Sequence, residues 1–118
     1  RGIASERILL AGFSQGGAIA LHVGLRSQEA LAGIVALSTY IACDANLDEE
    51  RSPANHEIPI FQAHGSMDPM VPMALGQAAR ERLEGLGYSV DWHDYPMQHQ
   101  VCTEEIQALG AWLQERLA

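Results

Sequence analysis

The sequence predicts an α/β fold in which a mostly parallel sheet carries helices on both faces. Short apolar runs typical of strands alternate along the chain with longer segments whose apolar residues recur at helical spacing. No internal repeat, linker or break in composition divides the 118 residues. We therefore interpret residues 1–118 as a single unit.

The first half of the chain supplies two of the strands and one helix. Residues 7–11 and residues 33–37 are short apolar runs, and both are predicted to be buried strands. Between them, residues 18–25 suit a well-buried helix. Residues 38–57 are polar and rich in turn-forming types, which predicts a long surface loop.

The second half continues the alternation, with a third strand predicted over residues 58–63. The next helix is predicted to end at Gly87 and to bury one face, made of Leu75, Ala78, Ala79, Leu83 and Leu86. Residues 89–95 alternate in polarity, which predicts a half-solvated edge strand. The last helix is predicted to pack inward through five residues, Ile106, Leu109, Trp112, Leu113 and Leu117.

The composition argues against a nucleic-acid partner and a membrane span, and it favours one cellular location. The net charge is −8, and all seven basic residues are arginines. A chain this acidic has no long basic face for phosphates, so we expect no nucleic-acid partner. Its longest apolar runs are a few residues, so we expect no membrane span. Two cysteines, Cys43 and Cys102, are too few for a disulfide scaffold and favour a cytoplasmic location.

The segment after the first strand carries the pattern G-x-S-x-G, from Gly12 to Gly16. Between a strand and a helix, this spacing forms a sharp, strained turn that exposes the oxygen of the serine, here Ser14. We expect both glycines to be required, because a Cβ at either would strike the neighbouring strand or helix. The alternative is an ordinary glycine-rich turn, and the position between strand and helix favours the nucleophile.

A serine nucleophile needs a base and a carboxylate that orients the base. Asp68 follows the third strand and His99 follows the fourth, so both leave carboxyl ends of strands, as Ser14 does. Ligand sites gather at that edge of a parallel sheet. Taken singly, Asp68 also suits a turn or helix cap, and His99 a capping histidine. Their joint placement predicts a Ser-His-Asp triad.

The other four histidines are weaker candidates. We expect His22 to pack within the first helix and His56 to be exposed in the surface loop. His64 is expected to make a structural hydrogen bond, and His93 to be exposed on the edge strand. A metal site that combined His64 with Asp68, His99 and Cys102 is the alternative use of these residues. No metal-binding motif supports it, so we expect neither a metal nor a cofactor.

Several motifs resemble the carboxylesterase and acyl-protein thioesterase family of α/β-hydrolases. The resemblance is carried by Gly12–Ala18, Ala36–Tyr40, His64–Pro72 and Tyr95–His99. The likeness covers essentially the whole chain but only the C-terminal half of such an enzyme. It implies that Ser14 is the nucleophile, Asp68 the orienting acid and His99 the base. One departure is Gln98, where the family commonly has glycine.

The resemblance also implies hydrolysis of short- or medium-chain esters, and of thioesters, without a cofactor. The backbone N–H of Gln15 would stabilise the oxyanion, and a loop before the first strand would supply a second donor. Met70 and residues 38–57 would form part of the substrate pocket. Only eleven residues precede Gly12, too few for that loop. We therefore expect an enzyme that needs an N-terminal half or a second chain, including a second copy; the alternative is an idle assembly or binding module.

Overall fold

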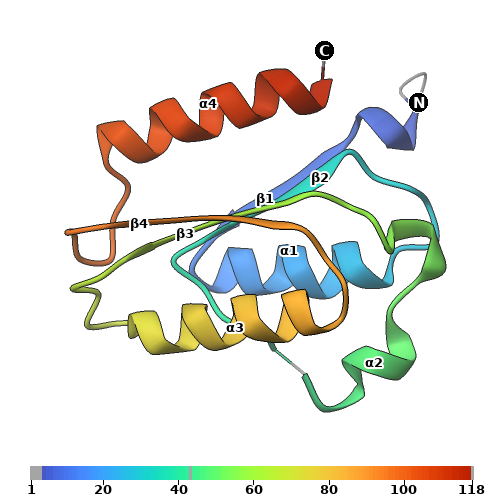
Figure 1. Ribbon diagram of the computed structural model, residues 1–118, viewed down its shortest axis with the longest axis horizontal. Coiled ribbons are helices and arrows are strands. Elements are labelled where there is room, and N and C mark those ends of the chain that lie inside the picture. The colour runs from blue at the N-terminus through green and yellow to red at the C-terminus, as the bar shows by residue number, and fades with distance from the viewer. Residues whose placement is uncertain (1–3, 43, 118) are drawn as a thin grey trace.

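The computed structural model describes residues 4–42 and 44–117, which build one four-stranded sheet (Figure 1). The strands are β1 (Leu9–Phe13), β2 (Gly33–Leu37), β3 (Ile60–Gly65) and β4 (Val90–Tyr95), and they lie in the order β1-β2-β3-β4. Every neighbouring pair is parallel. This arrangement confirms the predicted α/β class.

Three helices cover the two faces of the sheet (Figure 1). The helices α1 (Gln15–Arg26) and α3 (Met73–Gly85) lie on one face, and α4 (Thr103–Leu117) lies on the other. A short 3₁₀ turn, η1 (Ser5–Arg7), precedes β1, so the first strand starts later than predicted. None of the helices in the described ranges combines the length and apolar character needed to span a bilayer.

Each face of the sheet buries its own apolar cluster, because alternate strand residues point to opposite sides. Ile34 and Ile60 face α1 and α3 and pack with Leu21, Leu25 and Leu83. The intervening strand residues face α4, and the cluster there is formed by Val35, Phe61, Ala63 and Trp112. The central strands β2 and β3 are therefore buried on both sides.

The end of α3 has the predicted glycine. Gly87 lies just beyond the helix with φ +97°, a conformation that glycine adopts without steric cost. Its N–H donates to Glu84 O at 3.0 Å, and the N–H of Tyr88 donates to Leu83 O at 3.0 Å. These two bonds form a Schellman motif, which satisfies the last carbonyl groups of α3.

The predicted inward faces of the last two helices are partly wrong. Leu75 of α3 is 49% exposed and Ile106 of α4 is 58% exposed. The sheet instead meets α3 along Gly76, Ala79 and Leu83. Leucine and alanine occur on overlapping stripes of α3, so apolar spacing alone does not decide which stripe meets the sheet.

Both edge strands also differ from expectation in part. β1 lies at an edge, with Leu9 and Leu10 half-buried and Ala11 exposed, so residues 7–11 do not form the buried strand that their composition predicts. β4 lies at the other edge, as predicted. His93, expected on a solvated face, is half-buried and stacks on Phe61 at 5.0 Å between ring centroids. The reason is that α4 covers the side of β4 that carries His93.

Residues 38–57 are more ordered than the predicted loop. They contain η2 (Asp44–Asn46), the short helix α2 (Leu47–Glu50) and η3 (Pro53–Asn55). Leu47 is fully buried in the cluster beneath α1 and α3. The amide of Asn55 accepts from the N–H of Leu31 at 2.9 Å and donates to two carbonyl groups of residues 27–29. One buried apolar residue and one buried amide thus fix this polar segment, and Cys43 lies outside the described residues.

Candidate active site

The turn between β1 and α1 presents Ser14 above the sheet. Ser14 precedes the first residue of α1 and has φ 60° and ψ −123°, a sparsely populated backbone conformation. A Cβ on Gly12 would lie 2.1 Å from the carbonyl oxygen of Gly16, so Gly12 must be glycine, as expected. The same expectation is wrong for Gly16, where a Cβ would meet nothing within 4 Å. Instead Gly17 is constrained, because its Cβ would lie 2.8 Å from Thr39.

The loop after β3 holds Asp68 with its side chain fully buried. Carboxylate oxygen Oδ1 accepts from the backbone N–H groups of Met70 at 2.8 Å and Val71 at 2.9 Å. The remaining oxygen, Oδ2, points to His99 at 2.6 Å from Nδ1. The backbone bonds therefore fix the carboxylate in the orientation that faces the histidine.

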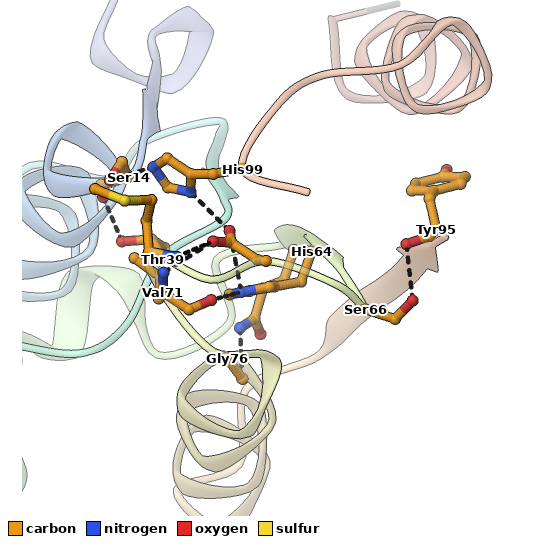
Figure 2. A network of polar contacts seen from close by, with 11 residues as sticks. Ser14, Thr39, His64, Ser66, Val71, Gly76, Tyr95 and His99 are labelled. Atoms are coloured by element: carbon orange, nitrogen blue, oxygen red, sulfur yellow. Dashed lines mark hydrogen bonds and ion pairs between the residues drawn. The ribbon is translucent and has the colours of Figure 1, made fainter. Parts of the chain in front are cut away.

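The loop after β4 brings His99 between the other two residues (Figure 2). Nε2 of His99 lies 2.9 Å from Oγ of Ser14, while Nδ1 faces Asp68. The Phe13 ring packs against the imidazole at 4.7 Å between centroids. Among described non-glycine residues, positive φ occurs at Ser14 and Ser38 only, so Gln98 does not adopt a glycine-type conformation before His99.

The surroundings of Asp68 favour the ionised form of its carboxyl group. Burial alone would raise the pKa of Asp68, but the Val71 N–H, His99 and the Met70 N–H together hold that pKa below its usual value. A carboxylate that is charged near neutral pH stabilises the Nδ1–H tautomer of His99. In that tautomer Nε2 is bare and can accept a hydrogen bond from the hydroxyl of Ser14.

The two other predicted site residues lie near this group. Gln15 is the first residue of α1, a position whose N–H has no acceptor within the helix. Met70 is 72% exposed on the loop that carries Asp68. An apolar recess of about 230 Å³ opens beside Gln15 and is lined also by Ala18, Ile19, His22, Tyr40 and Ala42. A larger cleft of about 460 Å³ lies around Arg26 and Arg51, away from Ser14.

The remaining histidines occupy separate places. His22 is half-buried on α1 and His56 is exposed, in line with the sequence analysis. His64 is fully buried, and its Nε2 lies 2.7 Å from Val71 O, which is the structural hydrogen bond expected of it. Nε2 also lies 3.8 Å from Oδ2 of Asp68 (Figure 2).

Sequence reasoning missed two contacts at this site, those of Phe13 and Thr39. Phe13 is the variable residue before the serine in the G-x-S-x-G pattern, and its ring covers His99. Thr39 is buried just after β2, and its hydroxyl donates to the carbonyl of Ser14. Both contacts cross between strands, so no spacing along the chain reveals them.

Fold and site together define an α/β-hydrolase: a serine turn between strand and helix is followed, in chain order, by an acid and a histidine beyond later strands. The chain belongs to the phospholipase/carboxylesterase family, whose sequence pattern matches residues 1–117.

Named relatives support this assignment. The chain is 44% identical to acyl-protein thioesterase 1 of Neurospora crassa, over 98% of this chain and 49% of that protein. The crystal structure of Arabidopsis thaliana SOBER1 matches with a TM-score of 0.92 and 28% identity, covering 99% of this chain and 56% of that one. Zea mays acyl-protein thioesterase 2 matches with a TM-score of 0.83 and 28% identity, covering 92% and 55%. The chain spans about half the length of the curated relatives it matches.

Proposed function

We propose that this chain carries the catalytic triad of a serine hydrolase that cleaves short- to medium-chain carboxylic esters, and thioesters, without a cofactor. The observation that carries the proposal is the position of His99, with Nε2 2.9 Å from Ser14 Oγ and Nδ1 2.6 Å from Asp68 Oδ2. Membership of a family of esterases and the names of the thioesterase relatives support the same reaction class.

The reaction follows from the direction of these hydrogen bonds. His99 takes the hydroxyl proton as Ser14 Oγ attacks the acyl carbon, and Asp68 stabilises the imidazolium that forms. The Gln15 N–H, at the start of α1, donates to the oxyanion. His99 then protonates the leaving alcohol or thiol, which departs from an acyl-serine. Water attacks that ester while His99 removes its proton, and the acid is released with Ser14 restored.

Two features support an apolar substrate group next to Ser14. The recess beside Gln15 is lined mainly by apolar atoms from α1 and from residues 40–42. Met70 adds a flexible apolar side chain on the loop that carries Asp68. We propose that the recess takes one side of the ester and that Met70 covers another part of the substrate.

We also propose that the edge of β1 is covered by a segment of the natural polypeptide beyond these 118 residues. Ile19 and Val23 on α1 are 56% and 49% exposed, and together with Leu10 and Ala11 they line an apolar recess of about 190 Å³ beside β1. Relatives about twice as long contain further chain that could occupy this face. The same segment would supply the second oxyanion donor.

The test is labelling by a fluorophosphonate, which forms a covalent bond with an activated serine. We expect the full natural polypeptide that contains residues 1–118 to gain one label by intact mass, and Ser14→Ala to gain none. Ser66→Ala is the matched control, because Ser66 is exposed near the site but bonds Tyr95 O (Figure 2). Labelling that persists in Ser14→Ala would overturn the proposal.

The 118-residue chain is tested beside the full polypeptide. Labelling of the longer polypeptide alone would support the covering segment. Equal labelling of both would show that the chain assembles its nucleophile unaided and would contradict the need for a further segment. If neither is labelled while both are folded, the triad is idle, and the binding-module alternative is favoured.

A further inference from the structure

Both backbone groups of Ser14, its N–H and its carbonyl, are hydrogen-bonded to residues at the end of the neighbouring strand β2. On one side, the N–H of Ser14 donates to Leu37 O at 2.8 Å. On the other, Oγ1 of Thr39 donates to Ser14 O at 2.5 Å (Figure 2). Both partners belong to residues 37–39, which are the last residue of β2 and the two residues after it, and which we name the β2 exit turn.

The β2 exit turn has a strained backbone and is hydrogen-bonded to β3. Ser38 has φ 52°, and Ser38 and Ser14 are the two non-glycine residues with positive φ in the described ranges. The N–H of Ser38 donates to Ala63 O at 2.8 Å, which ties the turn to β3. Because Phe13 pairs with Leu37, the two strained turns leave β1 and β2 at the same level of the sheet.

The hydroxyl of Thr39 adds to bonds that α1 already makes. The carbonyl of Ser14 also accepts from the N–H groups of Gly17 at 3.0 Å and Ala18 at 3.2 Å. Those two donors belong to α1, whereas Thr39 lies two residues after β2, next to Ser38, whose N–H bonds to β3. The threonine therefore links the serine turn to β2, in addition to the bonds that any helix start provides.

We propose that Thr39 is a positioning residue for acyl transfer at Ser14. Its hydroxyl keeps the strained serine backbone at one height above the sheet, so that Ser14 Oγ stays within reach of His99 through acylation and deacylation. A displacement of about 1 Å at a reacting group costs up to about 10²-fold in rate. This inference rests on the proposed function and adds a residue that contacts no substrate atom.

A purely structural role would come from the buried shape of Thr39 and not from its hydroxyl. The side chain packs against the backbone of Gly17, where a Cβ would lie 2.8 Å from the Thr39 methyl carbon. Valine keeps this shape and removes the donor, while serine keeps the donor and removes the methyl group. The two substitutions therefore separate positioning from packing.

The experiment compares Thr39→Val and Thr39→Ser in the full natural polypeptide. Hydrolysis of p-nitrophenyl butyrate gives kcat and KM, and the rate of fluorophosphonate labelling reports on Ser14 directly. We expect Thr39→Val to lower kcat and the labelling rate about tenfold, the effect of losing one hydrogen bond that is realised at the reacting group, with KM changed by less than about twofold. Thr39→Ser should restore at least about half of the wild-type kcat.

Control variants keep the inference open to refutation. Thr103→Val is the same chemical change on an exposed threonine of α4 and should leave both rates unchanged. If Thr39→Val does not fold, Thr39→Ala and Thr39→Ser give the same comparison, because they differ only by the hydroxyl. Equal kcat in variants with and without the hydroxyl overturns the inference. A wild type that is folded but unreactive towards the phosphonate refutes the proposed function itself, and this inference with it.

Discussion

Replacing Asp68 by asparagine changes one atom of the site and reverses one hydrogen bond. In the wild type, Oδ2 of Asp68 accepts from His99 Nδ1 at 2.6 Å, while Oδ1 accepts from two backbone N–H groups. Asparagine keeps the Oδ1 acceptor but places an NH₂ donor opposite Nδ1. His99 must then carry its proton on Nε2, which faces Ser14 and can no longer accept the hydroxyl proton.

The expected loss of activity is large and the loss of stability is small. A base held in the wrong tautomer costs about 10⁴-fold in kcat, which is about 5 kcal/mol of barrier at about 1.36 kcal/mol per tenfold. Because the two backbone N–H groups stay paired, the free energy of unfolding should fall by only about 1–2 kcal/mol. Asp68→Ala loses the same activity, but it leaves both N–H groups without an acceptor and costs about 1–3 kcal/mol for each.

Stability should also depend on pH in a defined direction. The pKa of Asp68 is lowered in the folded protein, so its charge contributes stability above the unfolded carboxyl pKa of about 3.9. That contribution is lost as the pH falls through the lower, folded pKa. The difference in unfolding free energy between wild type and Asp68→Asn should therefore narrow below about pH 4.

Steady-state ester hydrolysis and urea unfolding, measured on the same preparations, test these expectations. A kcat for Asp68→Asn within about tenfold of wild type would refute the tautomer argument, because that argument requires a loss of about 10⁴. An asparagine variant as unstable as Asp68→Ala would refute the assigned role of Oδ1.

Three further substitutions probe the serine turn and the buried carboxyl of α4. Gly12→Ala should lower the free energy of unfolding by at least about 2 kcal/mol, because the new Cβ would lie 2.1 Å from the Gly16 carbonyl oxygen. Gly16→Ala places its Cβ in open space and should raise the free energy of unfolding by up to about 1 kcal/mol. Equal changes in the melting temperature of the two variants would contradict this expectation. Burial raises the pKa of Glu105, a fully buried carboxyl, although a backbone hydrogen bond at Cys102 and the nearby His93 act in the opposite direction. The folded state therefore loses stability as the pH rises from about 4.5 through that raised pKa. Glu105→Gln should match the wild type in unfolding free energy at pH 4 and be the more stable of the two at pH 8, and a difference independent of pH would contradict the assignment.

The sequence predicts the parallel sheet and the convergence of the three site residues because both follow from local signals. Strand-like runs fix the order of the elements, and residues beyond the carboxyl ends of parallel strands share one edge. The G-x-S-x-G pattern identified Ser14, and chain order then selected Asp68 and His99. The catalytic roles of these residues stay predictions until the serine is labelled.

What the sequence does not show depends on contacts between distant segments. Leu47 stands in a polar stretch, and it becomes part of the core through its contacts with the apolar cluster beneath α1 and α3. Ile106 belongs to the apolar pattern of α4 but lies on the stripe that the sheet does not cover. Thr39 follows β2 in sequence, and its importance arises from the adjacent turn of β1. Each case needs the partner surface, which no local spacing encodes.

The strand order β1-β2-β3-β4 repeats the order of the chain, so each new strand adds beside the one synthesised before it. Ser14 emerges from the ribosome 85 residues before its partner His99. A nascent chain that has released only the first three strands therefore carries a serine with no base beside it. On the proposed mechanism, this serine gains its base only after β4 has joined the sheet and His99 has followed it.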